Sequence, residues 1–255
     1  MRPRRNNNSS RFGKFLTLQF SASGRMQGAF MKTYLLEKSR ITQQLTGEQN
    51  YHVLYQVAKG VPADLKSKYG MGAVEAWRYL NLDAKHPAQW DLFPATFEEL
   101  SAAMDAFPTV AKLKDCAWRI LIAILHLGNA QFKGTGEDDA VFVDSKPVAM
   151  AASCLGVEEQ QLSKAICTLN IKAGLDWIAK PNTTTYSQSV KDALSRALYA
   201  KLFDGIVDAI NASLMFGGSS RYFIGAVDIF GFECFPVNSL EQLCINFANE
   251  KLQRM

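Results

Sequence analysis

Residues 222–233 read YFIGAVDIFGFE, and this stretch decides how the fold is interpreted. Its first six residues are apolar and β-prone, which predicts a strand buried on both faces. Asp228 follows at the end of that strand, where a carboxylate can reach a metal ion through a water molecule. Gly231 predicts a tight turn in which its backbone N–H can approach a phosphate closely. Glu233 closes the stretch with a second carboxylate.

A second polar stretch lies near the start of the chain, where residues 6–14 read NNNSSRFGK. A nucleoside triphosphate with magnesium requires oxygen ligands for the metal, donors for the phosphate oxygens and a group that places the attacking water. Hydroxyl oxygens suit the near-octahedral coordination of Mg²⁺, and amides can donate to phosphate. The candidate ligands in this stretch are Asn6, Asn8, Ser9 and Ser10.

Each stretch alone has a plainer interpretation. Asn and Ser favour solvated turns, and an Asp-x-x-Gly string after a strand is usually only a turn. Arg11 and Glu233 are also compatible with ordinary surface charges. The two stretches together, in this order, instead favour a pair of loops that sense a terminal phosphate, and an ion pair between Arg11 and Glu233 would close one loop against the other.

The amino-acid sequences of both stretches resemble those of one family. NNNSSRFGKF at residues 6–15 is similar to switch I of myosin motor domains, and DIFGFE at residues 228–233 is similar to myosin switch II. Kinesins are the nearest alternative, but their switches typically read Ser-Ser-Arg-Ser-His and Asp-Leu-Ala-Gly-Ser-Glu. Further similar strings are GAF at 28–30, TYLLEKSR at 33–40, NYH at 50–52, ILHLGN at 124–129 and NSLEQLCINF at 238–247.

The resemblance implies an α/β fold: a P-loop NTPase-like central sheet, present in part, with a large, mostly helical upper-subdomain insertion. Residues 1–255 would form part of one motor domain. Within it, residues 6–40 would hold switch I and strands of the central sheet. Residues 41–217 would form the helical insertion, and residues 218–255 the switch II strand and the start of the relay helix.

The resemblance also implies ATP and Mg²⁺ as ligands, with in-line hydrolysis by water. Ser10 would bind the metal, with Asp228 in its outer shell. The Gly231 N–H would bind the γ-phosphate, and Arg11 and Glu233 would form the salt bridge that shuts the site. The remaining phosphate contacts, and the orientation of the water, would fall to Asn6, Asn8 and Ser9.

No G-x-x-x-x-G-K-[ST] string, the P-loop motif, occurs among the 255 residues. We therefore expect the chain to begin after the P-loop of a longer motor and to end within the relay helix. A lever arm, and the light chains it would bind, would then be absent. By family the chain is an actin-activated ATPase, but alone it is expected to be inactive. The alternative is a non-enzymatic remnant that binds actin or another partner.

The resemblance implies actin filaments as a partner. Residues 171–185 are similar to a surface loop that touches actin, in which myosins carry an acidic or phosphorylatable residue sixteen positions before an Asp-Ala-Leu string. Counting back from Asp192 gives Asp176. We therefore expect Asp176 to supply a permanent negative charge to this contact. An arbitrary loop aspartate is the alternative.

The composition is that of an ordinary globular protein, with a net charge of only +4, which gives no reason to expect a nucleic-acid partner. The sequence has no apolar run long enough for a transmembrane span, and its basic start, followed by asparagines, argues against a signal peptide. Five cysteines without metal spacing are typical of reduced thiols. With the resemblance, these features imply a cytoplasmic, cytoskeletal protein. The three histidines are interpreted as structural: His52, His86 and His126.

Local patterns predict several elements. Strands are expected over 15–20 and 26–37, beside the 222–229 strand, and a helix is expected to begin after Pro108. A long helix is expected over 184–214, despite the cost of Gly205 in its interior. Its predicted apolar ridge, with polar residues lying off it, is Val190, Leu194, Leu198, Leu202, Ile206, Ile210 and Leu214. A capping box at Ser239 predicts the start of the last helix.

Overall fold

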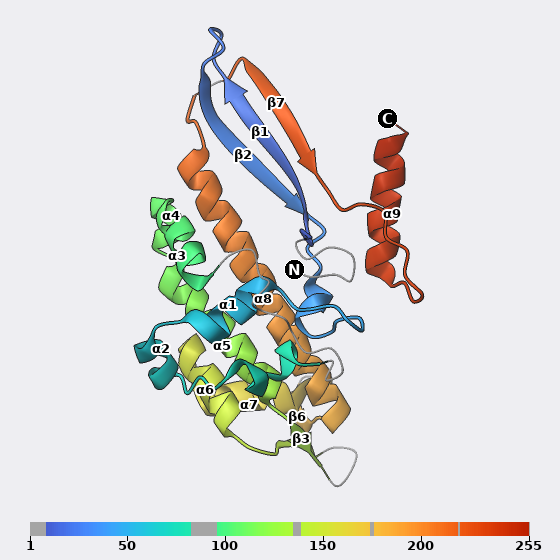
Figure 1. Cartoon of the computed structure of the whole chain (residues 1–255). Helices are drawn as coiled ribbons and strands as arrows, with labels where there is room; N and C mark the ends of the chain where they lie inside the picture. The colour runs from blue at the N-terminus through green and yellow to red at the C-terminus, as the bar shows by residue number, and fades with distance from the viewer. Residues whose placement is uncertain (1–8, 83–95, 135–138, 174–175, 219, 255) are drawn as a thin grey trace.

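The computed structural model describes residues 9–82, 96–134, 139–173, 176–218 and 220–254. A three-stranded antiparallel sheet has the order β2-β1-β7, built from β1 (Gly13–Phe20), β2 (Met26–Tyr34) and β7 (Tyr222–Asp228). In Figure 1 this sheet stands above a helical lobe, with the last helix, α9 (Leu240–Gln253), to one side.

The β1–β2 hairpin agrees with the sequence-based prediction except at its end. β2 stops at Tyr34 instead of continuing to Glu37, because Leu35 has φ +54° and leaves the extended region. The chain then turns so that the Glu37 N–H donates to the Arg11 carbonyl oxygen at 3.0 Å. The end of β2 is thereby fixed beside the residue that precedes β1.

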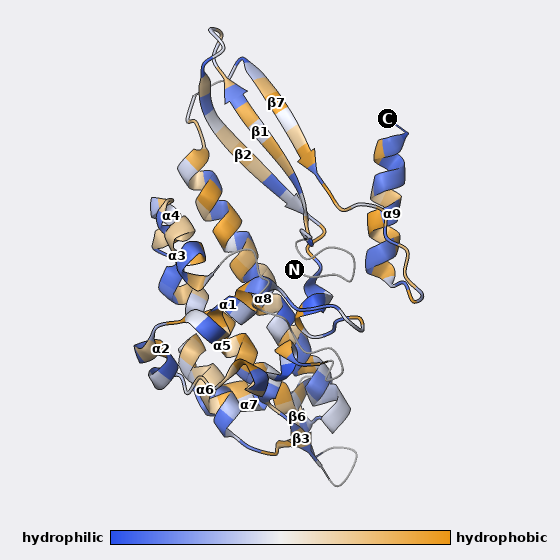
Figure 2. Cartoon of the chain, in the orientation of Figure 1, coloured by the Kyte–Doolittle hydropathy of each residue, from blue (hydrophilic) through white to orange (hydrophobic). Residues whose placement is uncertain are grey.

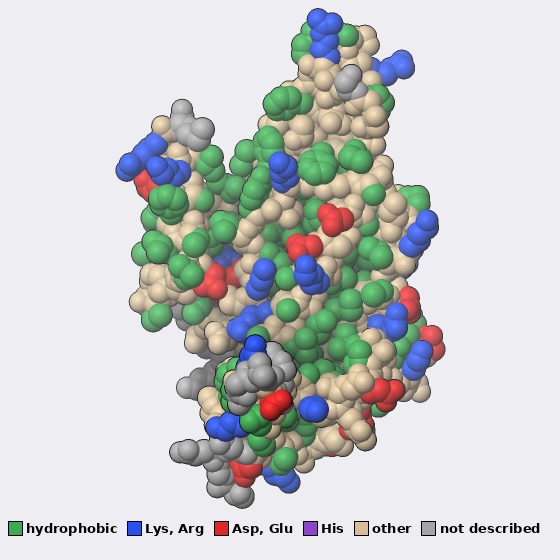
Figure 3. Space-filling model, turned by 180° about the vertical axis from the view of Figure 1, so that it is seen from behind, with side chains coloured by type: hydrophobic (Ala, Val, Ile, Leu, Met, Phe, Trp, Pro, Cys, Tyr) green, Lys and Arg blue, Asp and Glu red, His purple; other side chains and the backbone are tan. Residues whose placement is uncertain are grey.

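The prediction that β7 is buried on both faces is wrong. All seven residues of β7 are exposed, and Phe223 is 67% exposed. β7 pairs with β1 along one edge, and no other element of the described residues pairs with it. The apolar colour of β7 in Figure 2 therefore lies at the surface, and the view from behind in Figure 3 shows hydrophobic side chains across this end of the molecule. Apolar composition indicates what a strand prefers to contact, not whether a covering layer is present.

The core lies in the helical lobe around α5 (Lys114–Asn129), whose central residues are almost entirely buried. The helix expected after Pro108 is two helices, since α4 (Pro108–Ala111) ends before α5 begins. The other elements of the lobe are α1 (His52–Gly60), α2 (Ala63–Lys68), α3 (Phe97–Asp105), α6 (Lys146–Leu155), α7 (Glu159–Cys167), the 3₁₀ helices η1 (Lys38–Ile41), η2 (Val74–Ala76) and η3 (Arg78–Leu80), and the strand pairs β3 (Phe132–Lys133) with β4 (Val141–Phe142) and β5 (Thr168–Ala173) with β6 (Asp176–Pro181).

The long helix α8 (Thr184–Leu214) has the predicted bounds and runs unbroken through Gly205. The Thr183 hydroxyl oxygen caps it by accepting the Tyr186 N–H at 3.1 Å. Figure 1 shows α8 extending from the lobe to the sheet. It is therefore the element that physically joins the two parts of the described chain.

The side of α8 that faces inward differs from the prediction. Most of the apolar ridge is only half-buried against the core, whereas the polar residues Lys191, Ser195 and Asn211 are buried. The structure tolerates the burial of the polar Lys191 side chain because its Nζ donates to the carbonyl oxygen of Ala130 at 3.2 Å. Ala130 lies at the C-terminal end of α5. Such partners are invisible to a pattern that counts apolar spacing alone.

Candidate functional site

The N-terminal side of the candidate site lies just before β1. Asn6 and Asn8 fall outside the described residues. Ser10 is exposed, and the Ser9 hydroxyl donates to the Ser10 carbonyl oxygen at 3.4 Å. The Ser10 hydroxyl therefore lies at the surface beside the start of the sheet.

Arg11 is the buried centre of the site, with 1% of its surface exposed. Its Nη1 donates to Glu233 Oε1, and its Nη2 donates to Glu233 Oε2 at 3.2 Å. The ion pair expected between the two stretches is therefore present in the structure. The Arg11 guanidinium also lies over the Phe230 ring, 5.7 Å from its centroid, which adds a cation–π contact.

Glu37 is a second carboxylate partner of Arg11 that the sequence-based interpretation missed. Arg11 Nε donates to Glu37 Oε2 at 2.8 Å, and Nη2 donates to Oε1 at 3.2 Å. Arg40 contacts the same carboxylate, with Nε 2.5 Å from Oε2, and its Nη2 reaches Glu48 Oε2 at 2.7 Å. The result is a row of alternating charges, from Glu233 through Arg11, Glu37 and Arg40 to Glu48.

One local sequence feature indicates part of this row of alternating charges. Glu37 and Arg40 are three residues apart, directly after the apolar end of β2, a spacing that allows an ion pair within one helical turn. The contact with Arg11 depends on the hairpin, which brings residue 37 beside residue 11, and no local pattern reveals it.

The charges of this row stabilise one another. Burial alone would lower the pKa of Arg11, but its hydrogen bonds with Glu37 and Glu233 raise that pKa above its ordinary value. Burial alone would likewise raise the pKa of Glu37, but the hydrogen bonds from Arg11 and the charge of Arg40 lower it below its ordinary value. Both groups are therefore fully charged near neutral pH.

Asp228 is the last residue of β7 and pairs across the sheet with Lys14. Its Oδ2 lies 2.8 Å from Lys14 Nζ, and both side chains are exposed to solvent. A carboxylate in this position can accept further contacts, because an exposed ion pair is weak and readily rearranged. Asp228 is thus brought to the end of the sheet from which residues 9–12 lead into β1.

The tight turn predicted at Gly231 is absent. Residues 229–235 continue from β7 without a turn, and Gly231 is not among the glycines of positive φ. A Cβ placed on Gly231 would meet nothing within 4 Å, so its backbone faces open space. This segment carries the chain from the exposed β7 to Glu233, which pairs with Arg11.

Glu233 is attached to α9 as well as to Arg11. Its backbone N–H donates to Asn246 Oδ1 at 2.8 Å, and Asn246 Nδ2 donates back to the Glu233 carbonyl oxygen at 2.6 Å. Gln242 Nε2 donates to Glu233 Oε2 at 3.2 Å. The capping box predicted at Ser239 is present, with the Ser239 N–H donating to Gln242 Oε1 at 2.9 Å. The position of Glu233 is therefore tied to the first half of α9.

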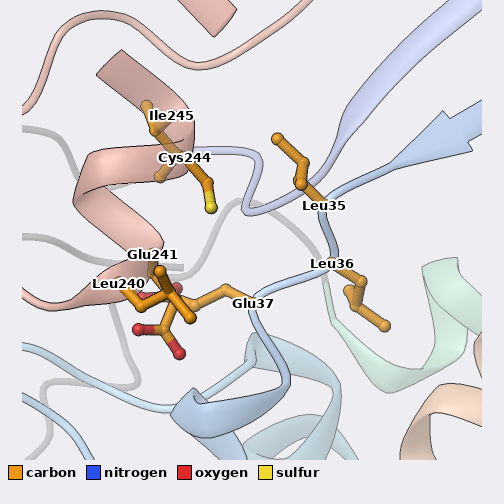
Figure 4. A pocket seen from close by; sticks show the side chains of 7 residues that line it. All are labelled: Leu35, Leu36, Glu37, Leu240, Glu241, Cys244 and Ile245. Carbon is orange, nitrogen blue, oxygen red and sulfur yellow. The ribbon is translucent and has the colours of Figure 1, made fainter. Parts of the chain in front are cut away.

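A small pocket of ≈150 Å³ lies between α9 and the segment that follows β2. Figure 4 shows Cys244 of α9 and Leu35 on opposite sides of it. Its lining, mostly apolar, is Leu35, Leu36, Glu37, Leu240, Glu241, Cys244 and Ile245. The start of α9 is thus loosely packed next to Glu37.

Asp176 lies on a different part of the molecule from the two switch stretches. It is the first residue of β6 and pairs with Ala173 of β5, so the stretch expected to be a surface loop is largely a two-stranded hairpin. Its side chain is exposed. In Figure 1, β6 lies at the far end of the helical lobe from the sheet.

The described residues lack two further kinds of feature. They contain no group of three or more His, Cys, Asp or Glu side chains arranged to hold a metal ion. They also contain no helix that is both long and apolar enough to cross a membrane. An oxygen-ligated metal held by a single serine and by a nucleotide would not require such a group.

Comparison of the sequence with known proteins identifies its family. The family model "Myosin head (motor domain)" matches residues 2–255. The non-muscle myosin-2 heavy chain of Acanthamoeba castellanii is 40% identical over 252 residues, which is 98% of this chain and 17% of that protein. Human unconventional myosin-Vc is 37% identical over 251 residues, 98% of this chain and 14% of that protein.

The myosin-J heavy chain of Dictyostelium discoideum is 37% identical over 257 residues, again 98% of this chain but 11% of that protein. The chain thus spans less than a fifth of the length of these three relatives. Since the family model covers nearly every residue, the chain belongs to the myosin head (motor domain) family.

Proposed function

We propose that this chain forms the part of an actin-based, ATP-hydrolysing motor that senses the terminal phosphate of ATP. The observation that carries the proposal is the buried ion pair of Arg11 with Glu233, two residues 222 positions apart. It joins the stretch before β1 to the stretch after β7. A contact of this kind gives a nucleotide a means of controlling where both stretches lie.

The available donors suit a magnesium nucleotide. Ser10 offers an exposed hydroxyl oxygen, and Asp228 offers a carboxylate near the same end of the sheet. Both are the hard oxygen ligands that Mg²⁺ prefers, with Asp228 acting through water. When bound, ATP with Mg²⁺ would supply the phosphoryl group that is cleaved and the metal charge that stabilises it.

The remaining residues would bind the phosphate and orient water. The open space around Gly231 leaves room for a phosphate oxygen at its backbone N–H. We assign the orientation of the attacking water to Ser9 and the donation of amide hydrogen bonds to Asn6 and Asn8. Arg11 and Glu233 would hold the two stretches together and exclude bulk water while the reaction proceeds.

The wider assignments follow from family membership. The three-stranded sheet would be part of a P-loop NTPase-like central sheet, with residues 41–217 as the upper-subdomain insertion. The protein would act on actin filaments of the cytoskeleton in the cytoplasm, with Asp176 among the contacts. The 255 residues contain no P-loop motif, so we expect hydrolysis only where such a loop is supplied.

A second candidate is a non-enzymatic module that binds actin or another partner. Co-sedimentation of the 255-residue chain with filamentous actin tests it. Binding without any nucleotide dependence, together with an inactive chimera in the experiment below, would support the module over the motor.

The motor assignment is tested in a chimera, in which residues 2–255 replace the corresponding segment of the Acanthamoeba myosin-2 motor domain. We expect ATP hydrolysis by the unsubstituted chimera. Arg11→Glu or Glu233→Arg should each abolish hydrolysis while nucleotide binding persists, since a buried charge loses its partner. The double exchange should restore part of the rate. Normal hydrolysis by the Arg11→Glu chimera would rule the assignment out.

A further inference from the structure

Arg11 is bound by two carboxylates that belong to different parts of the chain. Glu37 accepts from Nε and Nη2, and Glu233 accepts from Nη1 and Nη2. A guanidinium has five N–H groups in a fixed planar fork, so two glutamates together use most of its donors. The question is which of the two determines where Arg11 lies.

Glu37 is fixed by groups that do not belong to the switch II side of the site. Its backbone N–H donates to the Arg11 carbonyl oxygen at 3.0 Å, and its own carbonyl oxygen accepts the Tyr51 hydroxyl at 3.0 Å. Arg40 binds its carboxylate through both Nε and Nη2. All of these contacts come from residues 11–51.

Arg40 is itself anchored, so the support of Glu37 is rigid. Its Nη1 donates to the Gln49 carbonyl oxygen at 2.9 Å, and its Nη2 donates to Glu48 at 2.7 Å. Arg40 and Glu48 are both buried. Buried bidentate contacts of this kind hold a side chain in one orientation.

Glu233 is attached to α9, which is enclosed on one side, where Gln242 and Ile245 are buried, and open on the other. Its partners Gln242 and Asn246 lie on α9, whose apolar residues Leu240, Leu243 and Phe247 are 61–71% exposed. The pocket in Figure 4 lies between the start of α9 and the Glu37 segment. Glu233 is thus held through α9, whereas Glu37 is held by residues 11–51.

We propose that Glu37 is the positioning residue of Arg11: it keeps the guanidinium buried, oriented and charge-compensated when Glu233 withdraws. Without it, each opening of the switches would leave a buried cation unpaired, which is strongly unfavourable. With Glu37 present, Arg11 keeps one of its two carboxylate partners when the switches open. Its guanidinium then stays oriented toward the position that Glu233 occupies when they close. The consequence for catalysis rests on the proposed function, but the placement of Arg11 does not.

The placement of Arg11 is tested by NMR on the 255-residue chain. The quantity measured is the rate at which the Arg11 Nε–H exchanges with water. The signal of this group is assigned by its disappearance in Arg11→Lys. We expect Glu233→Gln to leave this rate within about 2-fold and Glu37→Gln to raise it by about 10-fold or more. Glu75→Gln is the control, because it makes the same change at an exposed glutamate of η2 that lies outside the row of charges.

The outcomes separate clearly. An unchanged rate in Glu37→Gln, or an equal rise in Glu233→Gln or in Glu75→Gln, would overturn the proposal. If circular dichroism shows that Glu37→Gln does not fold, Glu37→Asp is measured instead, since its shorter side chain keeps the charge but weakens the bidentate contact. An intermediate rise in the exchange rate then supports the proposal, and no rise overturns it.

The consequence for hydrolysis is tested in the chimera. Glu37→Gln should lower kcat by about 10-fold or more while KM for ATP changes less than about 3-fold, because the closed state and not substrate binding is impaired. Glu75→Gln should leave both nearly unchanged. An inactive unsubstituted chimera would count against the proposed function while the exchange measurement still decides the role of Glu37. An active chimera with normal kcat in Glu37→Gln would refute the catalytic part.

Discussion

The side-chain amide of Asn211 on α8 makes two hydrogen bonds with the backbone of a single residue, Met31 on β2. Asn211 Oδ1 accepts the Met31 N–H at 2.8 Å, and Asn211 Nδ2 donates to the Met31 carbonyl oxygen at 2.8 Å. The amide therefore pairs with the outer edge of β2 as a neighbouring strand would. It joins the long helix to the sheet at a point 180 residues away in sequence.

We predict that Asn211→Ala lowers the free energy of unfolding by about 2–3 kcal/mol, because two backbone groups lose their partners. Chemical denaturation monitored by circular dichroism measures the change. Asp208→Ala, an exposed position on the same helix, is the control and should stay within about 0.5 kcal/mol of the original chain. Equal effects of the two substitutions would contradict this role of Asn211.

We predict that Gly205→Ala stabilises the protein by about 0.5–1 kcal/mol, since alanine loses less backbone entropy than glycine in a helix. A Cβ at this position meets no atom within 4 Å, and the helix is continuous there. Gly156→Ala is the matched control: its surroundings are equally open, but its φ of +70° strains any residue with a Cβ. It should lower the melting temperature, whereas Gly205→Ala should raise it.

Stability should fall as the pH drops below about 6.5, the ordinary pKa of histidine. Burial lowers the pKa of His126 in the folded chain, although its Nε2 lies 2.7 Å from the Tyr69 carbonyl oxygen. The unfolded chain therefore binds a proton that the folded chain rejects, and the loss approaches about 1.4 kcal/mol per pH unit.

This loss should begin at about pH 6.5 and continue down to the lowered pKa of the folded state, while above pH 7 the ionisation of His126 no longer changes the stability. The measurement is the unfolding free energy at several pH values between 5 and 8, compared with His126→Gln. The difference between the two proteins should shrink as the pH falls. Parallel pH profiles would exclude His126 as the cause.

In the chimeric motor, Asp176→Asn should raise the actin concentration needed for half-maximal ATPase activation by about 2–5-fold, the scale of one exposed charge contact. The effect should weaken at high salt, because exposed charges are screened. Glu75→Gln, an exposed acidic residue of the helical lobe, serves as the control. Unchanged actin activation in Asp176→Asn would remove this residue from the contact.

Local sequence predicted what depends on local interactions. The bounds of α8, the capping box at Ser239 and the β1–β2 hairpin follow from caps, periodicity and turn residues, and the structure contains all three. The pairing of Arg11 with Glu233 followed from two stretches with complementary charge, each compared with a known family. The first three features needed no knowledge of what lies beside them in space, whereas the pairing joins residues 222 positions apart.

The errors share a different origin. The exposure of β7 and the burial of Lys191 depend on which elements pack against them, and apolar spacing carries no information about a missing layer or a distant carbonyl group. Glu37 was missed because its contact with Arg11 exists only once the hairpin has formed. The turn expected at Gly231 was wrong, since residues 229–235 lead from β7 to Glu233 without one.

The uninterrupted course of α8 has a mechanical consequence. At 1.5 Å per residue its 31 residues form a rod about 45 Å long, and a tilt of about 5° would move one end by about 4 Å relative to the other. The β5–β6 hairpin with Asp176 precedes one end, and Asn211 holds the other end against β2. A small rotation at the hairpin would therefore reach the sheet as a displacement as large as the spacing between two strands.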